Sequence, residues 1–140
     1  MTSSFPPAAP KQVWRNDYFL VLVDEPRRLV RNVRTARPYD SIEQLEAVME
    51  ELSRVLDGLG RSRYALLIDT RAAIGRNDPT FEATMRRLRP RWLSGFRRIG
   101  VLVQSVVGAM QIQRFAREDG FRRLITSNEA ELIEYLTQGG

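Results

Sequence analysis

The stretch from residue 64 to residue 82, YALLIDTRAAIGRNDPTFE, decides the fold. It opens with an apolar run at residues 64–68 that is too short for a buried helix, which is typical of a central strand covered on both faces. Asn77, Asp78 and Pro79 then predict a helix start, with an Asx cap and a proline at the first helical position. Because ligands and partners of α/β sheets bind beyond the carboxyl ends of such strands, we expect a functional site in the intervening loop.

Upstream of this stretch, the sequence predicts two strands and a helix. Residues 18–23 (YFLVLV) form one strand, and residues 28–37 form a second that pairs antiparallel with it at a sheet edge, where charged side chains are tolerated. A helix begins at residues 39–41, where Ser41 has capping-box spacing to Gln44 and Asp40 has the same spacing to Glu43. Its apolar residues recur three and four apart. Gly58 and Gly60 end this helix.

Downstream, strands and helices continue to alternate. Apolar spacing continues the helix after Asp78, but Pro90 is expected to break or kink it and to leave residues 91–96 as a separate turn. The sequence then predicts a strand at residues 99–103 and a helix at residues 106–118, capped by Ser105 and with Met110 facing the sheet. A strand at residues 121–125 follows. The terminal helix is capped within Thr126, Ser127 and Asn128, and Leu132, Ile133 and Leu136 lie on its buried side. The order β-β-α-β-α-β-α-β-α predicts the α/β class, with one mixed, mostly parallel sheet.

The composition of the 140-residue chain fits one globular domain. We expect a disordered tail at residues 1–12, whose start is rich in Pro, Ala and Ser, and a single domain at residues 13–138. No apolar run approaches the ~18 residues that span a membrane. There is no Cys and no signal-peptide pattern at the start, so the expected location is cytoplasmic.

Several kinds of chemistry are missing from the sequence. The chain has no His and no Cys, which removes His-dependent nucleophilic catalysis and His or Cys metal sites. No glycine-rich phosphate loop is present. We therefore expect no enzymatic activity, no cofactor and no metal.

The loop after the central strand is the strongest candidate site. It places Arg71, Arg76, Asn77, Asp78 and Thr80 at a helix N-terminus, whose free N–H groups and partial positive charge suit an anion, a phosphate or a carboxylate of a partner. A structural role is equally open, in which Asp78 caps the helix and Arg76 or Arg71 pairs with it. One loop can do both.

Over residues 14–136 the chain resembles the STAS-like fold of bacterial anti-sigma-factor antagonists, the SpoIIAA-like group. The resemblance rests on LLIDTRAAIGRNDPTFE (66–82), FRRIGVLVQSVVGAMQIQRFARED (96–119) and RRLITSNEAELIEYL (122–136). It implies a non-enzymatic switch module of bacterial signalling that docks on another protein, in the best-known branch a serine kinase. The implied docking surface comprises Arg71, Arg76, Asn77, Asp78, Thr80, Glu82, Ser105 and Gln111.

The phosphoacceptor of that branch is a Ser that follows an Asp at the helix start. Here the Asp falls on Asp78 and the acceptor position on Pro79, which cannot be phosphorylated. The next hydroxyl belongs to Thr80, where a phosphate would sit favourably at a helix N-terminus. Thr80 is therefore the candidate phosphorylation site.

Two alternatives remain at this stage, and homodimerisation is open. The chain also resembles a degenerate response-regulator receiver, which implies Asp69 as phosphoacceptor, Asp24 and Glu25 as Mg²⁺ ligands and Ser105 as the switch hydroxyl. The expected Lys after the last strand is missing.

The other alternative follows from the net charge of +5, which is carried almost entirely by Arg. It is an anion or nucleic-acid binder that uses Arg28, Arg31, Arg34, Arg86, Arg87, Arg89 and Arg91. Nucleic acid is the less favoured partner, because the arginines are scattered through every segment without an evident motif.

Overall fold

The computed structural model describes residues 9–76, 78–105, 110, 113 and 119–138. The strands are β1 (Lys11–Arg15), β2 (Phe19–Asp24), β3 (Leu29–Arg34), β4 (Ala65–Asp69), β5 (Ile99–Leu102) and β6 (Arg123–Thr126). The described helices are α1 (Ile42–Leu59), α2 (Pro79–Leu93) and α4 (Glu129–Thr137), with a 3-10 turn at Arg61–Arg63.

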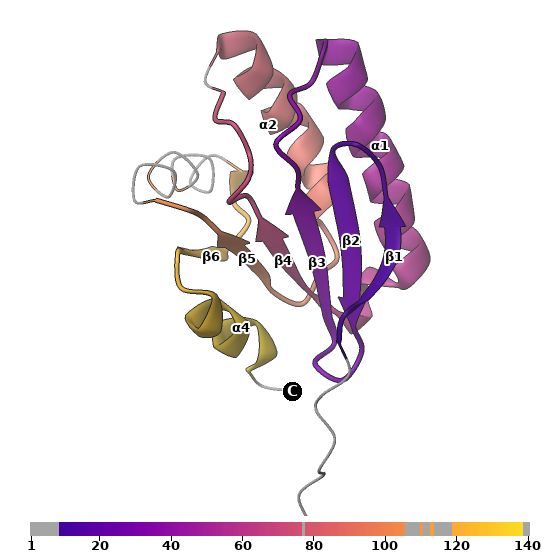
Figure 1. The fold of residues 1–140 in the computed structure, drawn as a ribbon, viewed down its shortest axis with the longest axis vertical. Coiled ribbons are helices and arrows are strands. Elements are labelled where there is room, and N and C mark those ends of the chain that lie inside the picture. Colours follow the sequence, from indigo (N-terminus) through magenta and orange to yellow (C-terminus); the bar gives the residue numbers. More distant parts are fainter. Residues whose placement is uncertain (1–8, 77, 106–109, 111–112, 114–118, 139–140) are drawn as a thin grey trace, which may run out of the picture.

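The strands form one mixed sheet in which spatial order follows chain order, β1-β2-β3-β4-β5-β6. The pairs β1–β2 and β2–β3 are antiparallel, whereas β3 to β6 are parallel. Helices α1 and α2 lie side by side against one face of the sheet, and α4 packs on the other (Figure 1). The predicted α/β class with a single mixed, mostly parallel sheet is confirmed.

The first strand corrects two predictions. Lys11 and Gln12, which were assigned to a disordered tail, belong to β1, while residues 1–8 lie outside the described part. Because β1 takes the edge beside β2, β3 is an interior strand between β2 and β4 and not the predicted edge strand. Its interior position buries Asn32 completely, and the amide oxygen of Asn32 accepts a hydrogen bond from Trp92 Nε1 at 3.0 Å.

Strand β4 is buried on both faces, as its apolar run predicted. Leu66 and Ile68 face the core under α1 and α2, whereas Ala65 and Leu67 face the smaller core under α4. This alternation places successive side chains on opposite faces of the pleat, so one short run contributes to both cores. The carboxyl end of β4 therefore emerges between two helical layers.

Helix α1 begins and ends where local signals predicted. Ser41 Oγ accepts a hydrogen bond from Gln44 N at 3.0 Å, and Gln44 Oε1 accepts one from Asp40 N at 2.6 Å. Gly60 ends the helix in a left-handed conformation, with φ of 83°, which glycine adopts without steric cost.

Helix α2 runs through Pro90 to Leu93, so the predicted break is wrong. Proline removes one N–H near the end of the helix, and the last turn is still closed by a hydrogen bond from Ser94 N to Pro90 O at 3.2 Å. Trp92 and Leu93 are buried in this turn, and their packing outweighs the local penalty.

In the C-terminal part, helix α4 matches its prediction more closely than strand β6 does. Asn128 Oδ1 accepts a hydrogen bond from Glu131 N at 3.0 Å, so the predicted cap is confirmed, and Leu132 and Leu136 are buried. Strand β6 begins at Arg123 rather than at residue 121. Most of the predicted helix at residues 106–118 lies outside the described residues; Met110, expected to face the sheet, is 65% exposed.

Candidate functional site

The candidate site lies beyond the carboxyl ends of β4 and β5, where the chain leaves β4 at Asp69 and enters α2 at Pro79. At the start of this loop the guanidinium of Arg71 forms a bidentate pair with the Asp69 carboxylate. Nε lies 3.0 Å from Oδ1 and Nη2 lies 2.8 Å from Oδ2. The backbone N–H of Arg71 also donates to Oδ1 at 3.1 Å. Asp69 thus fixes the direction in which the chain leaves the strand.

The charge of Asp69 is stabilised although the side chain is buried. Burial raises the pKa of Asp69, but hydrogen bonds from the side chain and backbone of Arg71 and the charges of Arg71 and Arg31 outweigh burial and hold the pKa below its usual value. Arg71 and Arg31 both also pair with Glu129 at the start of α4, at 3.3 and 3.1 Å. The four charges therefore tie the loop to α4.

The other end of the loop is fixed by a second ion pair. Arg76 Nε lies 2.7 Å from Asp78 Oδ1 and Nη2 lies 3.0 Å from Oδ2. Asp78 Oδ2 accepts the N–H of Phe81 at 3.1 Å, which caps α2, and the guanidinium of Arg76 lies 4.8 Å from the centre of the Phe81 ring. The side-chain hydrogen bonds of Arg76 lower the pKa of Asp78. The structural role proposed for Asp78 is thus confirmed, with Arg76 and not Arg71 as its partner.

Between these two anchored ends, Ile74 is 66% exposed. Thr80 and Ser105 are also exposed, and Glu82 is half-buried in the first turn of α2. The sequence reasoning missed Ile74, although an isolated apolar residue in a loop of Ala, Gly and Arg was a usable signal. Asn77 and Gln111 lie outside the described residues.

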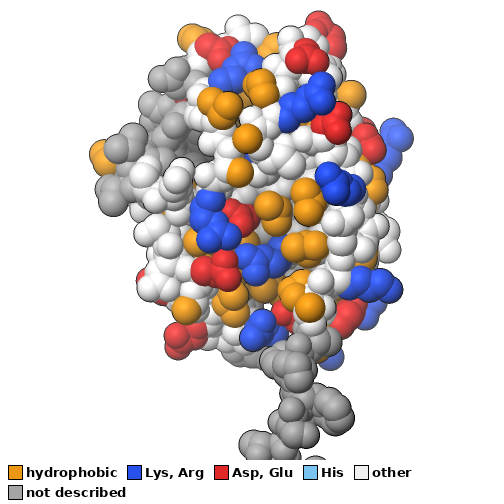
Figure 2. Space-filling model, viewed as in Figure 1, with side chains coloured by type: hydrophobic (Ala, Val, Ile, Leu, Met, Phe, Trp, Pro, Cys, Tyr) orange, Lys and Arg blue, Asp and Glu red, His pale blue; other side chains and the backbone are white. Residues whose placement is uncertain are grey.

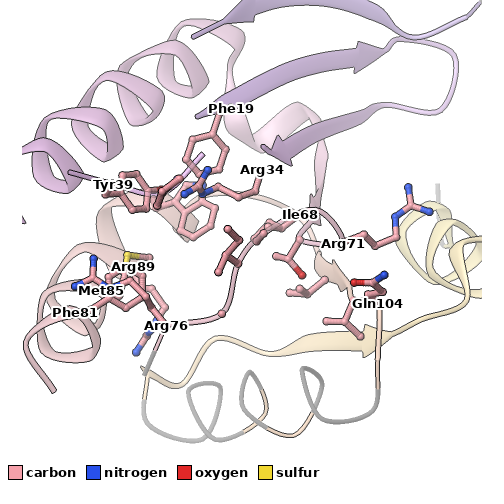
Figure 3. Close-up of a pocket in the computed structure, with 18 of the residues that line it drawn as sticks. Phe19, Arg34, Tyr39, Ile68, Arg71, Arg76, Phe81, Met85, Arg89 and Gln104 are labelled. Atoms are coloured by element: carbon pink, nitrogen blue, oxygen red, sulfur yellow. The ribbon is translucent and has the colours of Figure 1, made fainter. Parts of the chain in front are cut away.

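A pocket of about 460 Å³ opens beside this loop, between the sheet and α2 (Figure 3). The pocket brings together Arg71, Arg76 and Ser105 of the predicted site, whereas Thr80 and Glu82 do not line it. Figure 3 shows Arg71 directed away from the labelled aromatic side chains. The other charged residues that line the pocket are Arg34, Arg89 and Arg123, which the sequence did not assign to one site.

Two of these arginines are buried against one carboxylate. Asp119 Oδ2 lies 3.0 Å from Arg89 Nε and 2.7 Å from Arg123 Nη2, and all three side chains are at least nine-tenths buried. The pairing joins α2 to the start of β6 across the pocket wall. No pairing signal in the sequence connects these residues.

The receiver-like alternative is wrong. Asp24 and Asp69 each end a strand, but β2 runs antiparallel to β3, and β3 is parallel to β4, so the two carboxylates lie at opposite ends of the sheet. Asp24 instead pairs with Arg27 at 3.2 Å, and Glu25 Oε1 accepts a hydrogen bond from the Tyr64 hydroxyl at 2.6 Å. Among the described residues, no group of three or more His, Cys, Asp or Glu side chains could hold a metal ion.

The arginines of the nucleic-acid alternative do not all lie on one surface. Arg31 reaches α4, whereas Arg34, three residues later on β3, contacts Tyr18 and Tyr39 on the opposite side of the sheet. Figure 2 shows positive, negative and hydrophobic side chains interspersed over the face that it draws. Ion pairs between described residues engage several of these arginines: Arg31–Glu129, Arg87–Glu46, Arg89–Asp119, Arg91–Glu50 and Arg91–Asp57.

Comparison with known proteins supports the fold. No protein-family model matches the sequence, and no curated protein matches it. A solved structure from Shewanella loihica PV-4, an uncharacterised protein of the DUF3478 family with a SpoIIAA-like fold, superimposes with a TM-score of 0.52 and 15% sequence identity. The match covers 97% of this chain and 98% of that one. None of the described helices has the length and apolar character needed to cross a membrane. The chain therefore has the SpoIIAA-like fold that the sequence resemblance implied.

Proposed function

We propose that the protein is a non-enzymatic regulatory module that docks on another protein through the β4–α2 loop and the start of α2. The observation that carries the proposal is Ile74, an exposed apolar side chain on a loop anchored at both ends by forked ion pairs. A pre-organised loop loses little conformational entropy on binding, and an apolar side chain that enters a partner's pocket is a common centre of binding energy. The SpoIIAA-like fold adds support at the level of analogy.

The chemistry of the surface indicates what the partner offers. Ile74 needs an apolar pocket, and Arg71, which is 47% exposed in its side chain, can meet an acidic group at the rim while it remains bound to Asp69. A kinase or another signalling component is the proposed partner, and Thr80 is the proposed phosphorylation site because it is exposed in the first turn of α2.

Ile74→Asp tests the docking loop most directly. The substitution places a charge where the partner is expected to bury an apolar group, whereas Arg76→Glu would also disrupt the cap of α2. Val13→Asp is the matched control, because Val13 is an exposed apolar residue, at 41%, on the edge strand β1. Both changes are at exposed positions, so each is expected to alter the free energy of unfolding by less than about 0.5 kcal/mol.

The readout is capture of partners from a nuclease-treated lysate of the source cells, followed by titration of the captured protein against purified variants. We expect Ile74→Asp to weaken binding at least about tenfold, equal to about 1.4 kcal/mol, and Val13→Asp to change it less than about twofold. Equal binding by both variants would remove the loop as the docking surface. If Val13→Asp alone weakened binding, the contact would instead be assigned to the β1 edge, where a second copy of the chain can pair.

A further inference from the structure

The pocket beside the docking loop has walls made largely of aromatic side chains. Phe19, Tyr39, Phe81 and Trp92 line it, together with Met85. The rings also pack against one another. Phe19 and Trp92 meet edge to face with ring centres 6.2 Å apart, and the ring centres of Tyr39 and Phe81 are 6.4 Å apart. Such fixed rings present flat faces and edges suited to a planar ring, with which offset-stacked and edge-to-face contacts are favourable.

Arg34 places a positive charge among these rings. Its guanidinium carbon lies 4.4 Å from the centre of the Tyr39 ring and 5.7 Å from that of Phe19, and Figure 3 shows it directed toward Tyr39. Its Nη1 and Nη2 donate to the carbonyl oxygens of Thr35 and Arg37 at 2.7 and 2.6 Å, which fix the group without neutralising it. In the described part of the chain, no carboxylate pairs with Arg34.

The guanidinium lies in a network of hydrogen-bonding groups. Its Nη1 and Nη2 donate to backbone carbonyl oxygens, and the Arg34 side chain also hydrogen-bonds Tyr39, so an incoming carboxylate would join this network and meet the positive charge of Arg34. The described residues that line the pocket include five arginines and no acidic side chain. Four of the five are paired with Asp69, Asp78 or Asp119, so the charge available to a ligand is that of Arg34. A desolvated carboxylate or similar group would find a favourable charge here, and a cation would not.

We propose that this pocket binds a planar aromatic carboxylate, with its ring among Tyr39, Phe81 and Trp92 and its acid group on Arg34. The volume of about 460 Å³ accommodates a molecule with one or two fused rings, within the range of about 300–1,000 Å³ usual for small-molecule pockets. The ring preference follows from the aromatic walls and the charge preference from Arg34. Neither depends on the protein partner.

Calorimetric titration of the full chain with three probes tests both preferences. The probes are 2-naphthoate, the neutral alcohol 2-naphthalenemethanol, and decanoate, which keeps the carboxylate but replaces the rings with a flexible chain. We expect 2-naphthoate to bind at least about tenfold more tightly than either of the others, because the alcohol lacks the charge-assisted hydrogen bond and decanoate lacks the rings. Tighter binding of decanoate would overturn the ring assignment, and equal binding of the alcohol would overturn the role of Arg34.

Substitutions locate the site. Arg34→Gln is expected to weaken 2-naphthoate binding about tenfold or more, with little effect on the alcohol. Arg37→Gln is the matched control, because Arg37 is an exposed arginine near Tyr18 that does not line the pocket. Circular dichroism melting of both variants establishes that they are folded.

A second variant keeps the test decisive if Arg34→Gln does not fold. Gly75 lines the pocket, and a Cβ added there meets no atom within 4 Å, so Gly75→Phe can be accommodated while adding bulk at the pocket wall. We expect it to weaken 2-naphthoate binding, whereas Gly58→Phe, on α1 and equally open, is expected to leave binding unchanged. Unchanged binding in Gly75→Phe, or no binding of 2-naphthoate to the parent protein, would overturn the proposal.

Discussion

Asp69 and Arg71 show how single residues set the geometry of the loop. Asp69 is 6% exposed at the end of β4, yet its carboxylate remains charged because three N–H groups of Arg71 donate hydrogen bonds to it. A buried charge without such partners is strongly unfavourable. The same pair turns the chain away from the strand and brings Arg71 to Glu129 on α4.

Asp69→Asn should lower stability in a pH-dependent way. The folded-state pKa of Asp69 lies below its usual value, so its contribution is complete above the unfolded pKa of about 3.9 and is lost as the pH falls through the folded pKa. At pH 7 we expect the variant to lose about 1.5–3 kcal/mol, the range for hydrogen bonds to charged groups. Urea unfolding from pH 7 to pH 2 measures the difference, which should shrink below about pH 4.

Asp17→Asn is the control for this series. Asp17 forms an exposed ion pair with Arg37 at 3.0 Å, and its side chain is 68% exposed, so its loss should cost less than about 1 kcal/mol at pH 7. A deficit of Asp69→Asn that stays constant down to pH 2 would contradict the pairing described here.

At the level of single residues, local signals were predictive and long-range partners were not. Asp78 and Asn128 were identified as caps because a cap is defined by the next three residues. The pairing of Arg89 and Arg123 with Asp119 depends on α2 meeting the start of β6, which no local pattern encodes. The candidate loop was therefore located from the sequence, but the arginine-lined pocket beside it was not.

Secondary-structure elements differ in the same way. The bounds of α1 were predictable because its cap, its apolar spacing and Gly60 are all local. Strand β1 was missed because KQVWR is short and mostly exposed, and it becomes a strand only by pairing with β2. Without β1, the charged residues of β3 predict an edge strand. Its charges are instead accommodated by α4 and by loop carbonyls.

The contact between β5 and α4 depends on Gly100. A Cβ at this position would lie 2.3 Å from Leu132 Cδ1, and Leu132 is fully buried, so the helix has no room to accept it. We expect Gly100→Ala to destabilise the protein by about 1–3 kcal/mol, the usual cost of overpacking. Gly58→Ala, in the last turn of α1 where a Cβ meets nothing within 4 Å, should instead be neutral or stabilising by up to about 1 kcal/mol.

A double-mutant cycle separates packing from other effects of the added methyl group. If Leu132 is the obstacle, Gly100→Ala should cost less in a Leu132→Ala background than in the parent protein, with a coupling above about 0.5 kcal/mol. Urea unfolding of the four proteins measures it. An additive cycle would mean that α4 moves aside without cost.

For the whole molecule, sheet topology decides which residues can act together. The antiparallel pairing of β2 with β3 places the end of β2 opposite to the ends of β3, β4 and β5. Asp24 and Asp69 resemble one acidic site in the sequence because each ends an apolar strand. The predicted antiparallel pairing of the first two strands is confirmed, and the register places the two carboxylates at opposite ends of the sheet.

Net charge is the other property of the whole molecule, and it leads to a prediction about nucleic acid. The chain carries +5, but many arginines are paired with acidic side chains or with carbonyl oxygens, and they lie on both sides of the sheet. Binding to a duplex depends on several phosphates being contacted at once, and each contact steepens the salt dependence of the affinity. A dispersed charge of this size should make few contacts at a time.

We therefore expect weak binding to a 20-base-pair duplex at low salt, with a slope of log K against log salt concentration shallower than about −2. Fluorescence anisotropy between about 20 and 200 mM salt measures the slope. Arg27→Gln and Arg97→Gln, which change exposed arginines at the end of the sheet opposite the loop, should reduce it only slightly. A slope near −6 would instead require a contiguous basic surface, and would favour nucleic acid over a protein partner.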